Sequence, residues 1–330
     1  MDPSSETVYE IPGFIGIHKS GPVERLVGTQ TVPPSPSGDP ANGVASKDVV
    51  LDLAASISAR LYLPAATAAE PRRKFPVVVY YHGGAFVVQS AASPIYHKYA
   101  ASLVTAALAV VVSVNYRLAP EHPLPAAYDD AFVALRAIVA ACRPDGAEPW
   151  LAAHGDASRV VLAGDSSGAN MAHNTAIRLG KEGAGGYGDR VSGCWITGRK
   201  HTPTQLALTA ASRFAFLLLG TEPVRGESLG RLLLPRHHAA RSAPITGTST
   251  RRRRRRVAPA RVRPRAGHHG GVVLVRGECA RVRGGSRRAD GPELEFYETK
   301  GEKQTYFLFK PDCDSAAKEL TVVADFVKGC

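Results

Sequence analysis

The feature that most constrains the fold is a glycine-flanked serine between a strand-like and a helix-like segment. The motif GDSSG at residues 164–168 fits the pattern G-x-S-x-G. The apolar run Val160–Ala163 precedes it, and the helix-like stretch Ala169–His173 follows it. Strand, sharp turn and helix in this order place a serine hydroxyl at the end of a sheet. Ser166 is therefore the predicted catalytic nucleophile. Such a hydroxyl attacks only when a base takes its proton, so a base must come from elsewhere in the chain.

A second glycine motif, HGGAF at residues 82–86, directly follows the apolar run Phe75–Tyr81. Attack on an ester produces an oxyanion that backbone N–H groups must face, and glycine lets the backbone approach closely. We expect Gly83, Gly84 and Ser167 to supply these N–H groups. Either motif alone is also compatible with a simple turn, but together they predict the site of an α/β hydrolase.

The pattern of apolar runs agrees with that fold class. Continuous runs separated by helical stretches predict parallel strands with helices on both faces of the sheet. The sequence therefore predicts an α/β protein with a mostly parallel central sheet and an N-terminal cap segment. The expected strands lie at 48–63 (two strands), 75–81, 108–114, 160–163, 272–275 and 294–297, and the expected helices at 93–107, 126–141, 167–179 and 316–327.

The whole chain, residues 1–330, is expected to form one domain with an irregular segment at 1–45 as its cap and the last strand and helix within 292–330. The stretch 196–291 differs in composition. Residues 199–290 hold 21 Lys and Arg against four Asp and Glu, and residues 217–295 contain no aromatic side chain. We predict that this Arg-rich stretch is disordered. The same composition is typical of a GC-rich coding sequence read in another frame.

The net charge of +12 comes from this stretch, which includes the run Arg251–Arg256. Such a run is also found in nuclear-localisation and nucleic-acid-binding segments. It contains no aromatic side chain for base stacking, and no nucleic-acid-binding motif surrounds it. We therefore expect no specific nucleic-acid partner, only nonspecific binding of polyanions.

Other classes are disfavoured by what the sequence lacks. The apolar stretches are too short to cross a bilayer, and the first residues resemble no secretory signal, so a cytoplasmic, or also nuclear, location is expected. The five cysteines are scattered and predict reduced thiols. The histidine pairs lack metal-ligand spacing, so neither a metal nor a cofactor is expected.

The motifs at 82–86 and 164–168, together with NYRLAPEHPLPA at 115–126, resemble the plant carboxylesterases of the hormone-sensitive-lipase-like group, which includes the gibberellin receptors. The resemblance covers residues 8–195 and 292–330 and fails across most of 196–291. It implies an α/β-hydrolase fold, two-step ester hydrolysis and a small-molecule ester substrate or ligand. We expect Tyr116 and Arg117 to support the site structurally rather than to react.

The same resemblance indicates that the catalytic triad is incomplete. The family's esterases resemble G-E-x-H-x-F in the loop after the last strand, where this chain has Gly301-Glu302-Lys303-Gln304-Thr305-Tyr306. Gln304 therefore stands at the histidine position, and an amide cannot act as a base near neutral pH. Glu278 is the candidate acid and Asp290 a second one, although either can be an ordinary surface carboxylate. His268 or His269 remain as possible substitutes for the base.

Three interpretations follow from these residues. The first is a carboxylesterase-type serine hydrolase of small carboxylic esters, impaired by the loss of the histidine. The second is a non-catalytic small-molecule binder, because the gibberellin receptors keep the pocket and the serine but lack the triad histidine. The third is a misassembled gene product that folds poorly.

Overall fold

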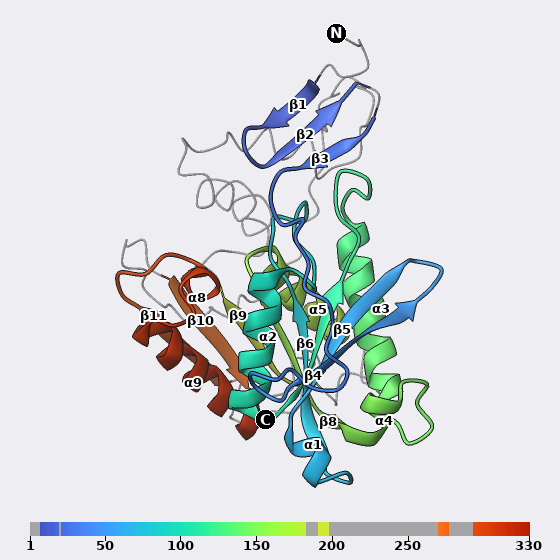
Figure 1. Cartoon of the computed structure of the whole chain (residues 1–330), viewed down its shortest axis with the longest axis vertical. Helices are drawn as coiled ribbons and strands as arrows, with labels where there is room; N and C mark the ends of the chain where they lie inside the picture. The colour runs from blue at the N-terminus through green and yellow to red at the C-terminus, as the bar shows by residue number, and fades with distance from the viewer. Residues whose placement is uncertain (1–6, 20, 183–190, 198–269, 277–292) are drawn as a thin grey trace, which may run out of the picture.

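A large mixed β-sheet organises the described part of the chain, which comprises residues 7–19, 21–182, 191–197, 270–276 and 293–330 of this computed structural model (Figure 1). Its strands are β4 (Ala45–Asp52), β5 (Ile57–Leu63), β6 (Phe75–Tyr81), β7 (Val110–Asn115), β8 (Gly155–Asp165), β9 (Val191–Thr197), β10 (Gly270–Arg276) and β11 (Glu293–Thr299). They lie side by side in the order β11-β10-β9-β8-β6-β7-β5-β4.

The centre of this sheet is parallel, and its two margins are antiparallel. β6 pairs in parallel with both β7 and β8, and β8 pairs in parallel with β9. β4, β5, β10 and β11 are joined to the sheet by antiparallel pairing. Because parallel neighbours end at the same edge, the residues that follow β6 and β8 meet in space. The HGGAF and GDSSG motifs occupy those two positions.

Two helical layers cover the sheet, as the apolar runs predicted. On one face lie α2 (Pro94–Ala107) and α9 (Asp314–Gly329), and on the other lie α3 (Ala126–Ala141) and α5 (Ser167–Glu182) (Figure 1). Successive side chains of β6 alternate between the two layers: Val77 and Val79 pack with the α3 and α5 core, whereas Val78 and Tyr80 pack with the α2 and α9 core. Every residue of β6 is buried. The remaining short helices are α1 (Ala66–Ala69), α4 (Pro149–His154) and α8 (Tyr306–Phe309).

The N-terminal segment is more regular than the sequence predicted. Three strands, β1 (Thr7–Ile11), β2 (Ile15–His18) and β3 (Val23–Arg25), form a small antiparallel sheet that lies beyond one end of the large one (Figure 1). The prediction of an irregular 1–45 was wrong here. Its buried side chains, including Phe14, cluster around the first turn instead of alternating along a long strand, so a period-2 pattern was too short to recognise.

The late elements agree with the predicted strands and the predicted last helix. Of the Arg-rich stretch 196–291, only 196–197 and 270–276 are described, as the end of β9 and as β10. The prediction that this stretch is disordered otherwise lies outside the described residues. Within the described ranges, no helix has both the length and the hydrophobicity that a membrane span requires.

Candidate active site

Ser166 lies on a strained turn between β8 and α5. Its φ of 52° is in the left-handed region, where a side chain is unfavourable by about 1–3 kcal/mol. The residue is 1% exposed. Such a conformation persists only where the surrounding contacts impose it. The sequence prediction of a sharp strand-to-helix turn at this serine therefore agrees with the backbone.

The two flanking glycines allow this turn to lie against the end of β6. A Cβ at Gly168 would overlap with the carbonyl oxygen of Tyr81, and a Cβ at Gly164 would lie 2.7 Å from the same oxygen. Any side chain at either position would push β8 and α5 away from β6. The glycines of the motif are thus required by close backbone approach, and this approach brings Ser166 next to the HGGAF loop.

The HGGAF loop forms a turn in which consecutive residues have positive φ. Gly84 has φ 111°, Ala85 59° and Phe86 64°, and the N–H groups of Val87 and Val88 both donate to the Gly84 carbonyl at 3.0 Å. Within the described residues, the N–H groups of Gly84 and Ala85 donate no hydrogen bond. They are therefore available to donate to the oxyanion that forms when an ester is attacked.

Gly83 has a different role from the predicted one. Its N–H donates to Asp165 Oδ1 at 3.0 Å and to Tyr96 Oη at 2.9 Å. An N–H that already has these two acceptors is not available for an oxyanion. The geometry thus favours Gly84 and Ala85 as the donors of the loop, with Ser167 as the donor from the first turn of α5, where helix amides lack intrahelical partners.

Asp165 is the functional residue that sequence reasoning missed. The side chain is 0% exposed and accepts hydrogen bonds from Tyr80 Oη at 2.8 Å, Tyr96 Oη at 3.0 Å and the Gly83 N–H. Burial raises the pKa of this carboxyl to about 6, against the opposing effect of its three hydrogen bonds. A charged residue at the end of an otherwise buried strand was the sequence signal that could have identified it.

His82 supports the loop rather than serving as a base. It is 1% exposed, stacks on Tyr116 with 4.4 Å between ring centroids, and its Nδ1 lies 2.7 Å from the Gly83 carbonyl oxygen. Burial lowers its pKa to about 4. Tyr116 Oη donates to the His82 carbonyl at 2.8 Å, and Arg117 pairs with the buried Asp130. Tyr116 and Arg117 therefore hold the surrounding loops, which fits the predicted supporting role.

No base contacts the nucleophile in the described part of the chain. Ser166 Oγ has no hydrogen-bond partner there. Gln304 is half-buried, and its backbone carbonyl oxygen accepts a hydrogen bond from the hydroxyl of Thr305 at 2.6 Å. Glu278, Asp290, His268 and His269 lie outside the described residues, so their predicted roles stay predictions.

The segment that carries Gln304 is itself anchored to the last helix. Tyr306 Oη and Thr299 Oγ1 donate to the same carboxylate oxygen of Glu319 at 2.9 and 3.2 Å. Burial raises the pKa of Glu319. A side chain at position 304 is therefore held on a defined loop even though glutamine supplies no base.

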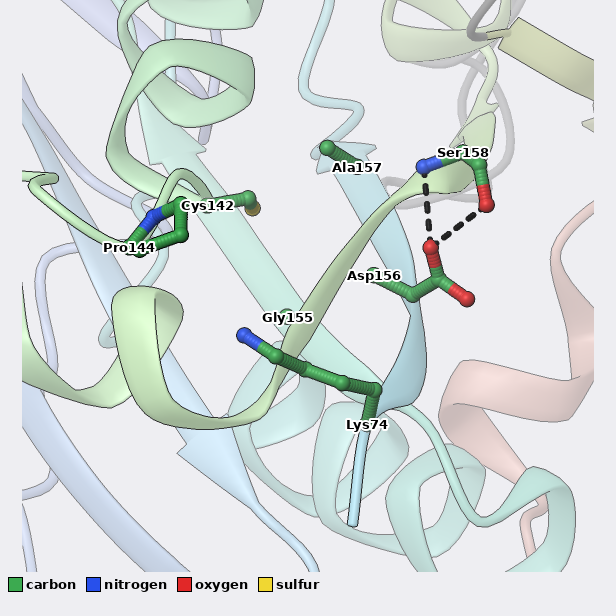
Figure 2. Close-up of a pocket in the computed structure, with 7 residues that line it drawn as sticks. All are labelled: Lys74, Cys142, Pro144, Gly155, Asp156, Ala157 and Ser158. Carbon is green, nitrogen blue, oxygen red and sulfur yellow. Dashed lines mark hydrogen bonds between the residues drawn. The ribbon is translucent and has the colours of Figure 1, made fainter. Parts of the chain in front are cut away.

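A surface pocket of about 480 Å³ lies away from this site (Figure 2). It adjoins the amino ends of β6 and β8, at the sheet edge opposite Ser166. Its polar groups already have partners: Asp156 Oδ1 accepts from the N–H and hydroxyl of Ser158, and Lys74 Nζ donates to the Ala152 carbonyl at 2.5 Å. The pocket is lined by Lys74, Cys142, Pro144, Gly155, Asp156, Ala157 and Ser158.

Comparison with known proteins agrees with this geometry. A family pattern described as an alpha/beta hydrolase fold matches residues 78–215. Probable carboxylesterase 1 of Arabidopsis thaliana is 35% identical over 329 residues, which cover 98% of each chain. The chain belongs to the plant carboxylesterase family of α/β hydrolases. The predicted fold class and family resemblance are thereby confirmed.

Other relatives match the chain more locally. A 2-hydroxyisoflavanone dehydratase of Glycyrrhiza echinata is 46% identical over 194 residues, 58% of each chain. Over such matches the chain spans about half the length of its relatives. Among solved structures, an esterase of Pyrobaculum calidifontis has 37% identity and a TM-score of 0.35, covering 42% of this chain and 40% of its own.

The glycine contacts predict that Gly168→Ala disrupts the turn. The added methyl group would overlap with the Tyr81 carbonyl, so we expect a loss of more than about 3 kcal/mol in unfolding free energy, or no soluble protein. Gly16→Ala is the matched control, because nothing lies within 4 Å of a Cβ at that position. Urea unfolding followed by circular dichroism measures both variants. Equal stabilities would contradict the close approach of the first turn of α5 to the end of β6.

The raised pKa of Asp165 predicts a specific pH dependence of stability. Since the folded state binds the proton more tightly than the unfolded chain, stability is lost as pH rises from the ordinary carboxyl pKa toward about 6. Asp165→Asn removes this ionisation. Relative to the variant, the wild type should lose on the order of 3 kcal/mol between about pH 4 and pH 7.

Unfolding free energies of both proteins across this pH range test the prediction. Asp165→Asn also changes hydrogen bonds, but that effect shifts its curve by an amount that does not depend on pH. Asp325→Asn, which removes an exposed carboxylate on α9, is the control. Parallel curves for the wild type and Asp165→Asn would show that Asp165 is not a buried titrating group.

Proposed function

We propose that the chain is a carboxylesterase-type serine hydrolase of small carboxylic esters with a triad impaired at position 304. The observation that carries the proposal is the juxtaposition of a strained, buried Ser166 with a turn whose Gly84 and Ala85 amides have no acceptor in the described residues. A nucleophile beside unpaired N–H donors is the arrangement that acyl transfer requires.

The chemistry would proceed in two steps. Ser166 Oγ forms a bond to the ester carbonyl carbon, and the negative charge of the tetrahedral intermediate moves to the former carbonyl oxygen. The Gly84, Ala85 and Ser167 amides stabilise that oxygen. The carbonyl then re-forms as the bond to the alkoxy group breaks, and the alcohol leaves with the proton that the Ser166 hydroxyl gave up, so that an acyl-enzyme remains. Water then attacks the acyl carbon, releases the acid and restores Ser166. Glu278 remains the proposed acidic residue of the catalytic triad.

The proton transfers are the weak part of this mechanism. Loss of a positioned base costs about 10²–10⁴ in rate, while the oxyanion donors and substrate binding can sustain residual turnover. We therefore propose slow hydrolysis rather than none.

Turnover of 4-nitrophenyl acetate by the purified full chain tests the proposal, with Ser166→Ala as the blank. Wild-type turnover should exceed the blank and be low. Folding of both proteins is verified by circular dichroism. Turnover equal to the blank in a folded wild-type protein would contradict the hydrolase proposal.

Gln304→His should increase kcat about tenfold or more, because it places an imidazole where the family has its base. Gln304→Ala is the matched control, since it removes the amide without adding a base. The double variant Ser166→Ala/Gln304→His should be inactive. An active double variant would mean that the new histidine reacts without Ser166.

A non-catalytic small-molecule binder is the second candidate. The absence of any partner for Ser166 Oγ in the described residues, together with Gln304, favours it. A binder would show no serine-dependent turnover with either wild type or Gln304→His, yet would still be stabilised against thermal unfolding by a small carboxylic acid or ester.

A further inference from the structure

Arg25, at the end of β3, connects the small N-terminal sheet to the large domain. Its Nε donates to the Val87 carbonyl at 2.6 Å, and its Nη2 donates to the Ala119 carbonyl at 3.2 Å. Glu121 accepts from both Nη1 and Nη2, at 2.8 and 2.6 Å. The Arg25 side chain is 19% exposed. One guanidinium therefore holds three separate points of the large domain.

One of these points lies in the oxyanion turn, and another lies on the loop that is hydrogen-bonded to that turn. Val87 lies in the turn closed by the Gly84 carbonyl, and its own carbonyl is the acceptor of Arg25. Ala119 donates its N–H to the Phe86 carbonyl at 2.8 Å while its carbonyl accepts from Arg25. Arg25 thus fastens the turn to the neighbouring loop from the outside. Glu121 orients the guanidinium through a bidentate ion pair.

The turn requires such support because of its backbone conformation. Ala85 and Phe86 both have positive φ, as does Gln89. Non-glycine residues remain in this region only when the surroundings impose it. Asp165 and Tyr96 hold the near end of the turn through the Gly83 amide, and Arg25 holds its far end.

We propose that Arg25 is a positioning residue for the oxyanion donors, and that the Gly84 and Ala85 amides adopt their orientation only when the β1–β3 sheet is seated on the large domain. The proposal rests on the proposed hydrolase function. The hydrogen bond from the Val32 amide to the Ala92 carbonyl at 2.9 Å extends the same contact along the chain. The N-terminal sheet then contributes to catalysis without any residue that touches the substrate.

The arrangement requires arginine rather than lysine. A guanidinium presents five N–H donors in a fixed plane and can serve two carbonyls and a carboxylate together. A lysine ammonium is a single point charge on a flexible chain, and it cannot reach Val87, Ala119 and Glu121 at once. Retaining the positive charge should therefore not retain the function.

Hydrogen exchange in the full-length protein tests the positioning directly. In Arg25→Ala and Arg25→Lys, the Val87 and Val88 amides should exchange about tenfold faster than in the wild type, because their turn opens more often. Amides of β7 should be unchanged, which separates a local effect from global unfolding. Arg73→Ala is the matched control, since Arg73 is an exposed arginine paired with Glu70. Unchanged exchange at Val87 and Val88 would overturn the proposal.

Kinetics distinguish positioning from a purely structural role. With 4-nitrophenyl acetate, we expect Arg25→Ala to lower kcat about tenfold and to leave KM within about twofold, because the donors act on the transition state. Added methylguanidinium should restore part of the lost kcat in Arg25→Ala, and it should leave the kcat of the control Arg73→Ala unchanged. Faster exchange with unchanged kcat would reduce Arg25 to a structural contact and overturn the positioning role.

Failure of the proposed function gives a different result. If the folded wild type shows no more turnover than Ser166→Ala, the hydrolase proposal fails, and the rate comparison is then made in the Gln304→His background. In that background, a normal kcat in the Arg25→Ala variant would still overturn the positioning role. Exchange at Val87 and Val88 depends on neither outcome.

Discussion

The hydrogen bond between the buried carboxylate of Asp165 and the Gly83 amide is the contact on which the rest of the site depends. It joins the residue before Ser166 to the first glycine of the HGGAF loop. Because neither group is exposed to water, each would be strongly destabilised without the other. The hydroxyls of Tyr80 and Tyr96 donate two further hydrogen bonds to this carboxylate, and these contacts hold the ends of β8 and β6 together. The direction of the Gly84 and Ala85 amides follows from it.

A second set of contacts supports the loop from the side of the N-terminal sheet. Arg25 reaches the turn that Asp165 holds from within, and the strained residues Ala85 and Phe86 lie between these two supports. Strain of this kind is stable only under opposing constraints. The small sheet therefore supports the conformation of the site through Arg25, although it contributes none of the predicted reactive groups.

The architecture and the proton chemistry of this chain are separable. The turn at Ser166, the oxyanion loop and the anchored segment before Tyr306 are each held by buried contacts that do not involve a base. With Gln304 on its loop, this scaffold is therefore retained at a position whose amide side chain cannot act as a base near neutral pH. This separation is compatible with both proposals, slow ester hydrolysis and ligand binding.

The sequence by itself determined the strand-to-helix serine turn, the glycine loop and the central parallel strands, because these depend on local residue types and on apolar runs that are buried whatever their partners. It also predicted that Gln304 cannot serve as the base, since an amide accepts no proton near neutral pH in any conformation. Only the tertiary structure decided that the Gly83 amide donates to Asp165 and that His82 stacks on another ring instead of acting as a base. It alone also decided that Arg25 donates to the Val87 carbonyl, 62 positions away in the chain. Those facts depend on which residues, distant in sequence, meet at one edge of a sheet, and no local pattern encodes such pairings.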